Sequence, residues 1–160
     1  MDIEYTEAAK EDIEELVRMR LAYIQDDFKN VSAEDMENMK NRLPDYFNRT
    51  LGKSLVAYIA KAGSRIVATA FLNIIEMPAN PNVKTVLTAE VLNVFTEKQM
   101  RGQGICTTLM AMLIAGAKER GLSRIDLSAT DAGYPVYKKA GFKDKVNGYK
   151  EMRLVLQPSC

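Results

Sequence analysis

The chain has 160 residues, of which 47% are hydrophobic and 27% charged, a composition typical of one soluble globular domain, here spanning 1–160. A net charge of +1 without a concentrated Lys/Arg run argues against a nucleic-acid partner. The densest apolar run, 109–117, is too short to cross a bilayer, and two cysteines with no histidine exclude a disulfide framework and a His/Cys zinc site, so we expect no metal.

The small net charge hides an uneven distribution along the chain. Residues 1–40 carry 12 Asp/Glu against 5 Lys/Arg, and residues 41–160 carry 17 Lys/Arg against 9 Asp/Glu. The N-terminal sequence is acidic and has no apolar signal core, so we expect a cytoplasmic protein without membrane attachment. Any general base must be a residue other than histidine.

The first third of the chain has a strand-like start followed by helical periodicity. Ile3 and Tyr5 alternate with charged residues as a short strand, and apolar side chains at helical spacing predict a helix over Ala9–Asp27. Ser32 is a good N-cap for a second helix, with Asp35 in place of the capping-box glutamate. Pro44 should kink or end this helix, which Asp45–Thr50 could continue.

The middle of the chain changes to strand periodicity. We predict a hairpin of two strands, Ser54–Lys61 and Arg65–Glu76, then a Pro/Asn-rich loop at Met77–Val83. Lys84–Phe95 follows as a nearly continuous apolar strand, which is typical of a buried central position.

The last third contains the most strongly apolar helix. It is predicted over Arg101–Arg120 and ends at Gly121. A strand at Arg124–Ser128, a helix at Ala132–Ala140 and a final strand at Tyr149–Leu156 complete the order β-α-α-β-β-β-α-β-α-β. We therefore predict a mixed α/β (α+β) fold with one parallel β-α-β crossover around the apolar helix.

A glycine-bearing loop joins the central strand to this helix. Gly102 and Gly104 permit close backbone approach, and the first-turn N–H groups of the helix favour an anion. The spacing matches neither a dinucleotide fingerprint, because Thr107 stands at the third glycine position, nor a P-loop, because no Lys-Ser/Thr pair follows. From the glycines alone, a simple tight turn remains an alternative to an anion cradle.

Three segments together resemble the GNAT superfamily of N-acetyltransferases. Gln99-x-x-Gly102-x-Gly104 matches its Q/R-x-x-G-x-G/A signature, and Leu92-Asn93-Val94 stands where these proteins have a strand ending in L-x-V. The segment from Tyr137 to Phe142 resembles the family's L-Y-E-K-x-G-F motif, with Val136 for Leu and Lys138 for Glu. The order of elements agrees over about residues 3–156, so the resemblance implies the GNAT fold: a mostly antiparallel sheet with a β-α-β core that binds acetyl-CoA.

The resemblance also assigns the cofactor site. The pyrophosphate of acetyl-CoA is expected on the loop and helix start, and the pantetheine amides on a bulged strand that diverges from the next parallel strand. Thr130 stands where many relatives have an asparagine that contacts the cofactor. The expected cofactor-binding residues are Leu92, Asn93, Val94, Gln99, Met100, Arg101, Gly102, Gln103, Gly104, Ile105 and Thr130.

In this family an unprotonated amine attacks the thioester directly. The resemblance assigns to Tyr137 the protonation of the departing CoA thiolate, and a backbone N–H near Val94 would polarise the thioester carbonyl. Cys106 lies where a helix start favours a thiolate, but we interpret it as a packing residue rather than a nucleophile. Glu90 is the candidate general base because it shares a strand face with Leu92; Glu76 and Asp126 are weaker candidates.

The resemblance implies that the first two helices form part of the wall for the amine acceptor. Acidic residues gather where they join, at Asp26, Asp27, Glu34, Asp35 and Glu37, and would attract a cationic amine unless they form only a solvated surface. Tyr23, Phe28, Tyr46 and Phe47 would line a pocket or pack in the core. The predicted activity is acetyl transfer to a primary amine of a small molecule or peptide; the alternative is a non-catalytic acyl-CoA-binding sensor. An exposed edge at the final strand is compatible with a homodimer.

Overall fold

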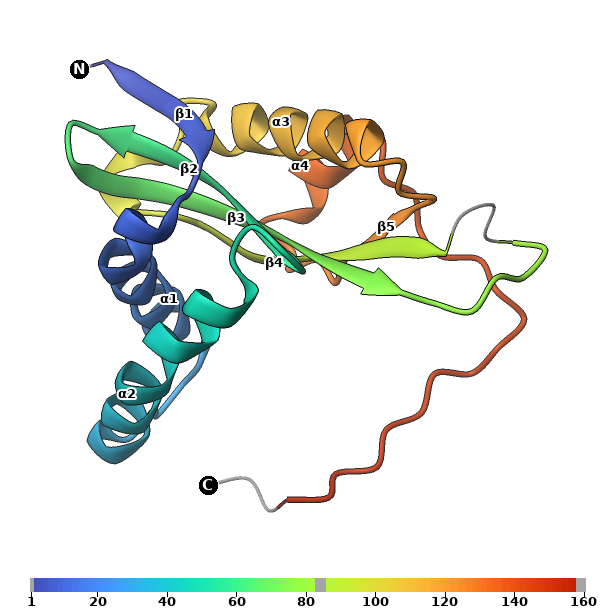
Figure 1. Cartoon of the computed structure of the whole chain (residues 1–160), viewed down its shortest axis with the longest axis horizontal. Coiled ribbons are helices and arrows are strands. Elements are labelled where there is room, and N and C mark those ends of the chain that lie inside the picture. The colour runs from blue at the N-terminus through green and yellow to red at the C-terminus, as the bar shows by residue number, and fades with distance from the viewer. Residues whose placement is uncertain (1, 83–85, 158–160) are drawn as a thin grey trace.

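In the computed structural model, which describes residues 2–82 and 86–157, five strands form one sheet in the order β1-β2-β3-β4-β5. The neighbouring pairs are antiparallel except β4 and β5, which are parallel, so the fold is mixed α/β as predicted. The strands are β1 (Ile3–Glu7), β2 (Leu55–Ala62), β3 (Arg65–Glu76), β4 (Leu87–Thr96) and β5 (Ile125–Asp126). Helix α3 joins β4 to β5 and makes the predicted parallel crossover (Figure 1).

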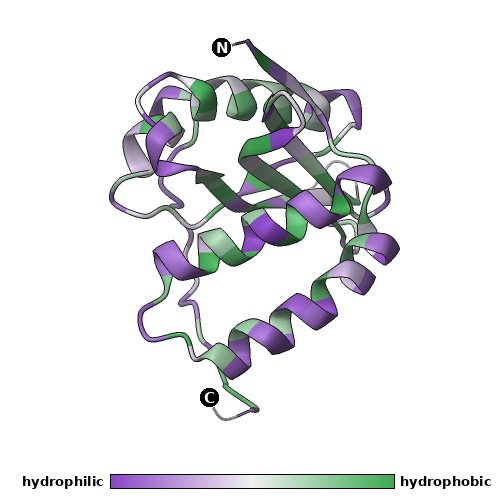
Figure 2. Cartoon of the chain, turned by 90° about the vertical axis from the view of Figure 1, so that its left-hand side faces the viewer, coloured by the Kyte–Doolittle hydropathy of each residue, from purple (hydrophilic) through white to green (hydrophobic). Residues whose placement is uncertain are grey.

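Helices cover both faces of the sheet. The helices are α1 (Ile13–Asp27), α2 (Ala33–Thr50), α3 (Ile105–Glu119) and α4 (Tyr134–Lys139). Helices α1 and α2 pack on one face around Leu16, Phe47 and Phe71, and α3 packs on the other around Tyr58, Leu109 and Leu113. Figure 2 shows mostly hydrophobic residues in the strands between them and a mixture of hydrophilic and hydrophobic residues along α1 and α2.

The two N-terminal helices begin and end close to their predicted limits. Helix α1 starts at Ile13, after a short 3-10 turn in which the Ala9 N–H donates to Asp12 Oδ2 at 2.9 Å. Ser32 caps α2 as predicted, because its Oγ accepts the Asp35 N–H at 3.0 Å. Pro44 does not end this helix, since the turn beyond it buries Phe47 completely and packing offsets the lost backbone hydrogen bond.

Two predicted strands differ in length from the structure. Strand β4 begins at Leu87; the predicted start at Lys84 lies outside the described residues. Strand β5 spans two residues rather than the predicted Arg124–Ser128, because only Ala89 and Glu90 of β4 pair with it. The chain beyond Asp126 then turns toward α4.

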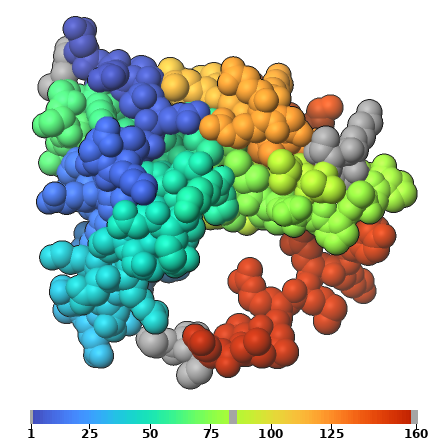
Figure 3. Space-filling view, viewed as in Figure 1, coloured from blue at the N-terminus to red at the C-terminus, as the bar shows by residue number. Residues whose placement is uncertain are grey.

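The predicted final strand over Tyr149–Leu156 is wrong for this structure. This segment makes no ladder with the described strands and leaves the sheet at its β5 edge (Figure 1). Figure 3 shows it apart from the body of the protein over most of its length. Alternating apolar residues favour a strand only where a partner edge is available, and the two-residue β5 offers almost none.

Within the described residues, no helix has both the length and the apolar character needed to cross a membrane. The same part of the chain holds no group of three or more His, Cys, Asp or Glu residues arranged to bind a metal ion.

Candidate active site

A β-bulge interrupts β4 at the predicted position. Phe71 of β3 pairs with Leu92 and Thr69 pairs with Phe95. Between these two pairs β4 therefore has one more residue than β3, which defines the bulge. Asn93 has a φ of 50° there, a left-handed conformation that asparagine tolerates better than most residues. The bulge turns the Asn93 side chain toward Thr69, whose Oγ1 accepts from Asn93 Nδ2 and donates to the Asn93 carbonyl, each at 3.0 Å.

Strands β4 and β5 diverge next to this bulge. Their ladder consists of Ala89 with Ile125 and Glu90 with Asp126, and the described residues form no further pair between the two strands. The backbone of Leu92–Val94 therefore faces a gap that an extended ligand could enter by pairing with β4. This is the divergence that the resemblance to the GNAT superfamily implied.

The loop after β4 requires glycine for its backbone conformation. Gly102 and Gly104 have φ values of 77° and 78°, which cost other residues roughly 1–2 kcal/mol. A Cβ at either position would meet no atom within 4 Å, so the space beside both glycines is open. Gly104 is the N-cap of α3, which therefore starts at Ile105 and not at the predicted Arg101.

Open space and an exposed helix start together make a cradle for an anion. The first backbone bond at this end of α3 runs from the Thr108 N–H to the Gly104 carbonyl at 3.1 Å, so the preceding amides have no intrahelical partner. They border a cavity of about 520 Å³ between this loop and α4. Its lining includes Val94, Met100, Arg101, Gly102, Gly104, Ile105, Thr130 and Tyr137, and these residues fit the pyrophosphate and pantetheine of acetyl-CoA.

The side chains of Gln99 and Gln103 do not line that cavity. Gln99 Nε2 donates to Glu97 Oε2 at 2.7 Å, so its contact in this structure fixes the loop. The Arg101 side chain connects the glycine loop to α1 and β4: its Nη2 donates to Asp26 Oδ2 at 2.8 Å, and its Nε donates to the Thr96 carbonyl at 2.9 Å.

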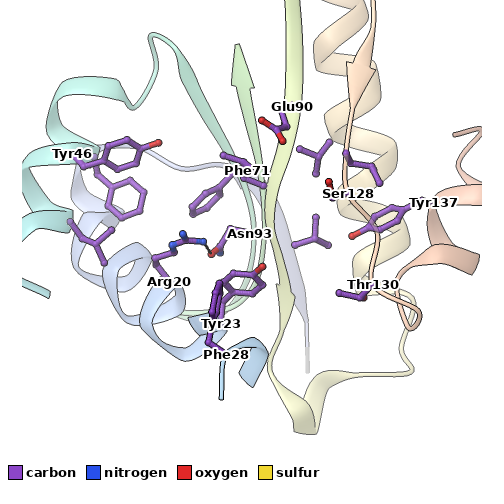
Figure 4. Close-up of a pocket in the computed structure, with 16 residues that line it drawn as sticks. Arg20, Tyr23, Phe28, Tyr46, Phe71, Glu90, Asn93, Ser128, Thr130 and Tyr137 are labelled. Carbon is purple, nitrogen blue, oxygen red and sulfur yellow. Dashed lines mark hydrogen bonds between the residues drawn. The ribbon is translucent and has the colours of Figure 1, made fainter. Parts of the chain in front are cut away.

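A second cavity, of about 480 Å³, lies on the α1 and α2 side of the bulge. Glu90 and Asn93 of β4 enter it beside Arg20 and Tyr23 of α1, and Tyr137 reaches it from α4 (Figure 4). Leu92 of β4 also lines it. Its apolar wall consists of Phe28, Leu43, Tyr46, Phe47, Phe71, Val91, Val94 and Leu127. Because Val94, Thr130 and Tyr137 border both cavities, the two meet at the bulge.

The structure separates the three candidate bases. Glu90 lines the second cavity, whereas Glu76 lies at the far end of the β3–β4 ladder opposite Leu87. Asp126 pairs with Arg124 at 3.1 Å and lies outside this cavity. Glu90 is therefore the one of the three whose carboxylate can meet an amine placed in this cavity.

Tyr137 occupies the junction of the two cavities. Burial, with smaller contributions from Cys106 and Tyr23, raises the pKa of Tyr137 to about 12, so its phenol stays protonated near neutral pH. The ring packs edge-on against Phe142. A Cβ on Gly133 would lie 2.8 Å from the Tyr137 ring, so this glycine is needed for the ring's position, a requirement that the sequence did not reveal.

Thr130 borders both cavities near Tyr137. Its Oγ1 accepts the Gly133 N–H at 3.2 Å and so helps to shape the turn before α4.

Cys106 is the second residue of α3 and packs against the core on that face of the sheet. Burial raises the pKa of its thiol, which opposes thiolate formation and supports a packing role.

We expect Cys106→Ala to keep kcat within about 3-fold of the wild-type value, since no bond to this sulfur is needed for direct transfer. Intact-mass measurement after incubation with acetyl-CoA alone should show no acetylated protein. If Cys106→Ala abolishes turnover but retains acetyl-CoA binding, the packing role is wrong and Cys106 acts as a nucleophile.

The acidic residues near the α1–α2 junction do not surround the second cavity. Asp26 and Asp27 border the cavity at the glycine loop, and Asp26 pairs with Arg101 at 2.8 Å and Lys98 at 3.3 Å. Asp35 accepts a hydrogen bond from Ser32, and it lines none of the described cavities, nor do Glu34 and Glu37. The predicted attraction of a cationic acceptor therefore has no support from the position of these side chains.

Arg20 lines the second cavity, and Thr69 and Glu97 hold Asn93 and Gln99 in place, although sequence patterns did not single these three residues out. Arg20 had the helical spacing of a core position, and Thr69 and Glu97 carried no motif. Their roles depend on contacts between elements that are far apart in the chain, such as Arg20 with Asn93 and Glu97 with Arg18.

Comparison with known proteins agrees with this geometry. The family model of the acetyltransferase (GNAT) family matches residues 16–142, and the chain belongs to this family of acetyl-CoA-dependent acyltransferases. No curated protein sequence matches the chain.

Solved structures extend the agreement over nearly the whole chain. A predicted acetyltransferase from Clostridium acetobutylicum, crystallised with acetyl-CoA, is 34% identical with a TM-score of 0.81, covering 95% of this chain and 96% of that one. A GCN5-related N-acetyltransferase from Ralstonia eutropha is 24% identical with a TM-score of 0.77 and coverage of 94% and 99%. Glucosamine-6-phosphate N-acetyltransferase from Arabidopsis thaliana shares the fold at 15% identity, with a TM-score of 0.65 and coverage of 95% and 99%.

Proposed function

We propose that this protein transfers the acetyl group of acetyl-CoA directly to a primary amine of a small molecule or peptide. The observation that carries the proposal is the junction at the β4 bulge, where the cavity beside the glycine loop meets a separate cavity that contains Glu90. Tyr137 borders both spaces. A thioester held along the bulge would thus be open to attack from the second cavity.

Each group has a role that its surroundings support. The amides at the start of α3 and the open space beside Gly102 and Gly104 suit the pyrophosphate. The diverging backbone of Leu92–Val94 suits the pantetheine amides, and an N–H near Val94 suits the thioester carbonyl. Bound acetyl-CoA supplies the activated acetyl group.

Proton movements complete the reaction. The amine nitrogen forms a bond to the acetyl carbon as the carbon–sulfur bond breaks. Glu90 accepts the proton that the amine loses, directly or through water, and Tyr137 provides a hydrogen-bond donor for the departing thiolate. Because its phenol is protonated near neutral pH, Tyr137 is in the form that can donate.

Acetyl-CoA turnover with a panel of primary amines tests the proposal. Thiol release that depends on an added amine, together with the acetylated amine detected by mass spectrometry, is the expected result. Tight acetyl-CoA binding without turnover of any amine would support the alternative, a non-catalytic acyl-CoA sensor.

We expect Glu90→Gln to lower kcat/KM about 100-fold at pH 7, because the amide cannot accept a proton from the ammonium form of the acceptor. The defect should shrink at pH values above the pKa of the acceptor amine, where no base is required. Glu76→Gln is the matched control and should match the wild type. A Glu90→Gln defect that is equal at every pH would assign Glu90 a binding role instead.

We propose one surface through which two copies of the chain would form a homodimer. The segment 143–157 exposes large apolar side chains, among them Val146, Met152 and Leu154, and the outer edge of β5 has no partner among the described strands. A second copy of the chain could cover both. The predicted cytoplasmic location likewise remains a proposal from the sequence.

A further inference from the structure

One arginine in the second cavity has a neutral partner instead of a carboxylate. Arg20 Nη1 donates to Asn93 Oδ1 at 3.0 Å, and the guanidinium lies over the Tyr23 ring, 5.3 Å from its centroid. Among the described residues, no carboxylate forms an ion pair with Arg20. Burial lowers the pKa of its guanidinium, and the nearby Tyr23, Tyr46 and Asp27 offset this only in part.

The neighbouring arginine shows what full pairing looks like in this protein. Arg18, two residues earlier on α1, binds Glu15 at 2.7 Å and Glu97 at 2.8 Å and also donates to the Ile66 carbonyl. Arg20 has one acceptor among the described residues, so several of its five donors have no partner there. No buried side-chain N or O atom of a described residue lacks a partner, so these donors reach open space.

Asn93 holds the guanidinium in place without neutralising it. Its Nδ2 is committed to Thr69 Oγ1, which orients its Oδ1 toward Arg20. Asn93 is itself 5% exposed and fixed by the bulge, so the arginine is preorganised at this point of the cavity. Figure 4 shows the Arg20 side chain reaching from α1 to Asn93 of β4. A partly buried charge with unused donors is suited to an anionic group on a ligand.

The position of Arg20 limits how far that anion lies from the reacting nitrogen. Asn93 precedes Val94, where the thioester carbonyl is proposed to lie, and Glu90 enters the same cavity from the same strand. An acceptor that reaches Arg20 therefore carries its anionic group a few atoms from its amine.

The cavity lining selects among anions. Among the described residues that line it, Arg20 is the single formally positive one, and the other polar side chains are hydroxyls, Asn93 and the acidic Glu90. One guanidinium matches a carboxylate in a bidentate manner, whereas a dianionic phosphate would call for further cations. The remaining wall is aromatic and aliphatic, which favours an apolar substituent.

We propose that the acceptor is a primary amine bearing a nearby carboxylate and an apolar or aromatic side chain, and that Arg20 binds the carboxylate. An amino acid with such a side chain is the simplest member of this class. The inference rests on the proposed acetyl transfer and replaces the cationic acceptor that charge along the chain had suggested.

The test compares amino acids with amines that differ only by loss of the carboxylate: L-phenylalanine with 2-phenylethylamine, L-tyrosine with tyramine, and L-leucine with isoamylamine. Spermidine represents cationic acceptors, and 1-amino-2-phenylethylphosphonate represents a doubly charged anion. Each compound is assayed for acetyl-CoA-dependent turnover. Its binding to the protein without acetyl-CoA is measured by calorimetry.

For at least one pair, we expect the amino acid to exceed its decarboxylated partner by roughly 10- to 100-fold in kcat/KM. Arg20→Met should abolish this preference, and Arg20→Lys should keep part of it, because lysine retains the charge without the planar fork. Arg42→Met, an exposed change outside the cavity, is the control. Retained acetyl-CoA affinity shows that each variant is folded.

Three results would overturn the inference: equal or better turnover of the decarboxylated amines or spermidine, a carboxylate preference that survives in Arg20→Met, or a preference for the phosphonate. Failure of the proposed function is distinguishable from these. If no amine is acetylated, but the amino acid binds the wild-type protein and not Arg20→Met, the proposed carboxylate site is supported and the proposed acetyl transfer is wrong. If neither binding nor turnover distinguishes an amino acid from its decarboxylated partner, the proposed role of Arg20 is wrong.

Discussion

Tyr137→Phe is expected to lower kcat by about 100-fold while the dissociation constant of acetyl-CoA stays within about 3-fold of the wild-type value. The change removes one hydroxyl and keeps the ring, including its edge-on contact with Phe142, so folding and cofactor binding should persist. What is lost is the donor at the junction of the two cavities, which acts when the thiolate departs. Single-turnover thiol release and calorimetric titration with acetyl-CoA measure the two quantities.

Tyr134→Phe on the same helix is the matched control. The Tyr134 hydroxyl donates to the Asp144 carboxylate at 3.0 Å and lies outside both cavities of the site. This variant should retain the wild-type kcat. Equal rates for Tyr137→Phe and the wild type would exclude the hydroxyl from the chemical step.

The dependence of kcat on pH tests the protonation state of the Tyr137 phenol. Because burial raises its pKa to about 12, the phenol remains protonated through the range in which an alkyl amine loses its proton. We expect kcat to rise with pH as the amine deprotonates and to show no decline near pH 10, where an ordinary tyrosine would ionise. A fall in kcat centred near 10 that disappears in Tyr137→Phe would contradict the raised pKa.

Glu97→Ala is expected to lower the free energy of unfolding by about 3 kcal/mol and Tm by roughly 10 °C. Glu97 is 7% exposed and accepts from Arg18 at 2.8 Å, Arg65 at 2.7 Å and Gln99 at 2.7 Å. Its loss removes the shared acceptor between α1, β3 and the start of the glycine loop. Denaturant unfolding and thermal scans measure the change in stability.

The same variant should weaken acetyl-CoA binding, because Gln99 loses the contact that holds its loop. Asp45→Ala is the control, since it breaks the exposed i,i+4 pair with Arg49 and should cost at most about 0.5 kcal/mol. If Glu97→Ala is no less stable than Asp45→Ala, the three contacts at Glu97 contribute little to the fold.

The glycine turn was predictable from local backbone chemistry, whereas the bulge in β4 was expected from the resemblance to the GNAT superfamily. Gly102 and Gly104 adopt conformations that other residues disfavour, and the family signature around them pointed to this loop as the proposed site for the pyrophosphate. The position of Tyr137 followed from its motif in the same way. By contrast, Arg20 gave no local signal, because its importance arises from Asn93, which lies 73 positions away in the chain.

The predicted final strand shows that a local sequence pattern can also fail to form the expected structure. Tyr149–Leu156 has the residue pattern of a strand, yet the structure gives it no partner, since β5 pairs through only two residues. Pro44 gave a local signal to stop a helix, and burial of Phe47 overrode it. In both cases the outcome depended on what surrounds the segment.

The sequence by itself determined the family, the order of elements through α4 and the loop that suits acetyl-CoA, because periodicity, turn residues and motifs act over short distances. Only the tertiary structure decided which charged side chains line the second cavity. It placed Asp26 on Arg101 at the loop and Arg20 on Asn93 in the second cavity, so the acidic first quarter of the chain does not form an acidic site. The charge that a ligand meets depends on which side chains remain unpaired after folding, and pairing is set by contacts between distant segments.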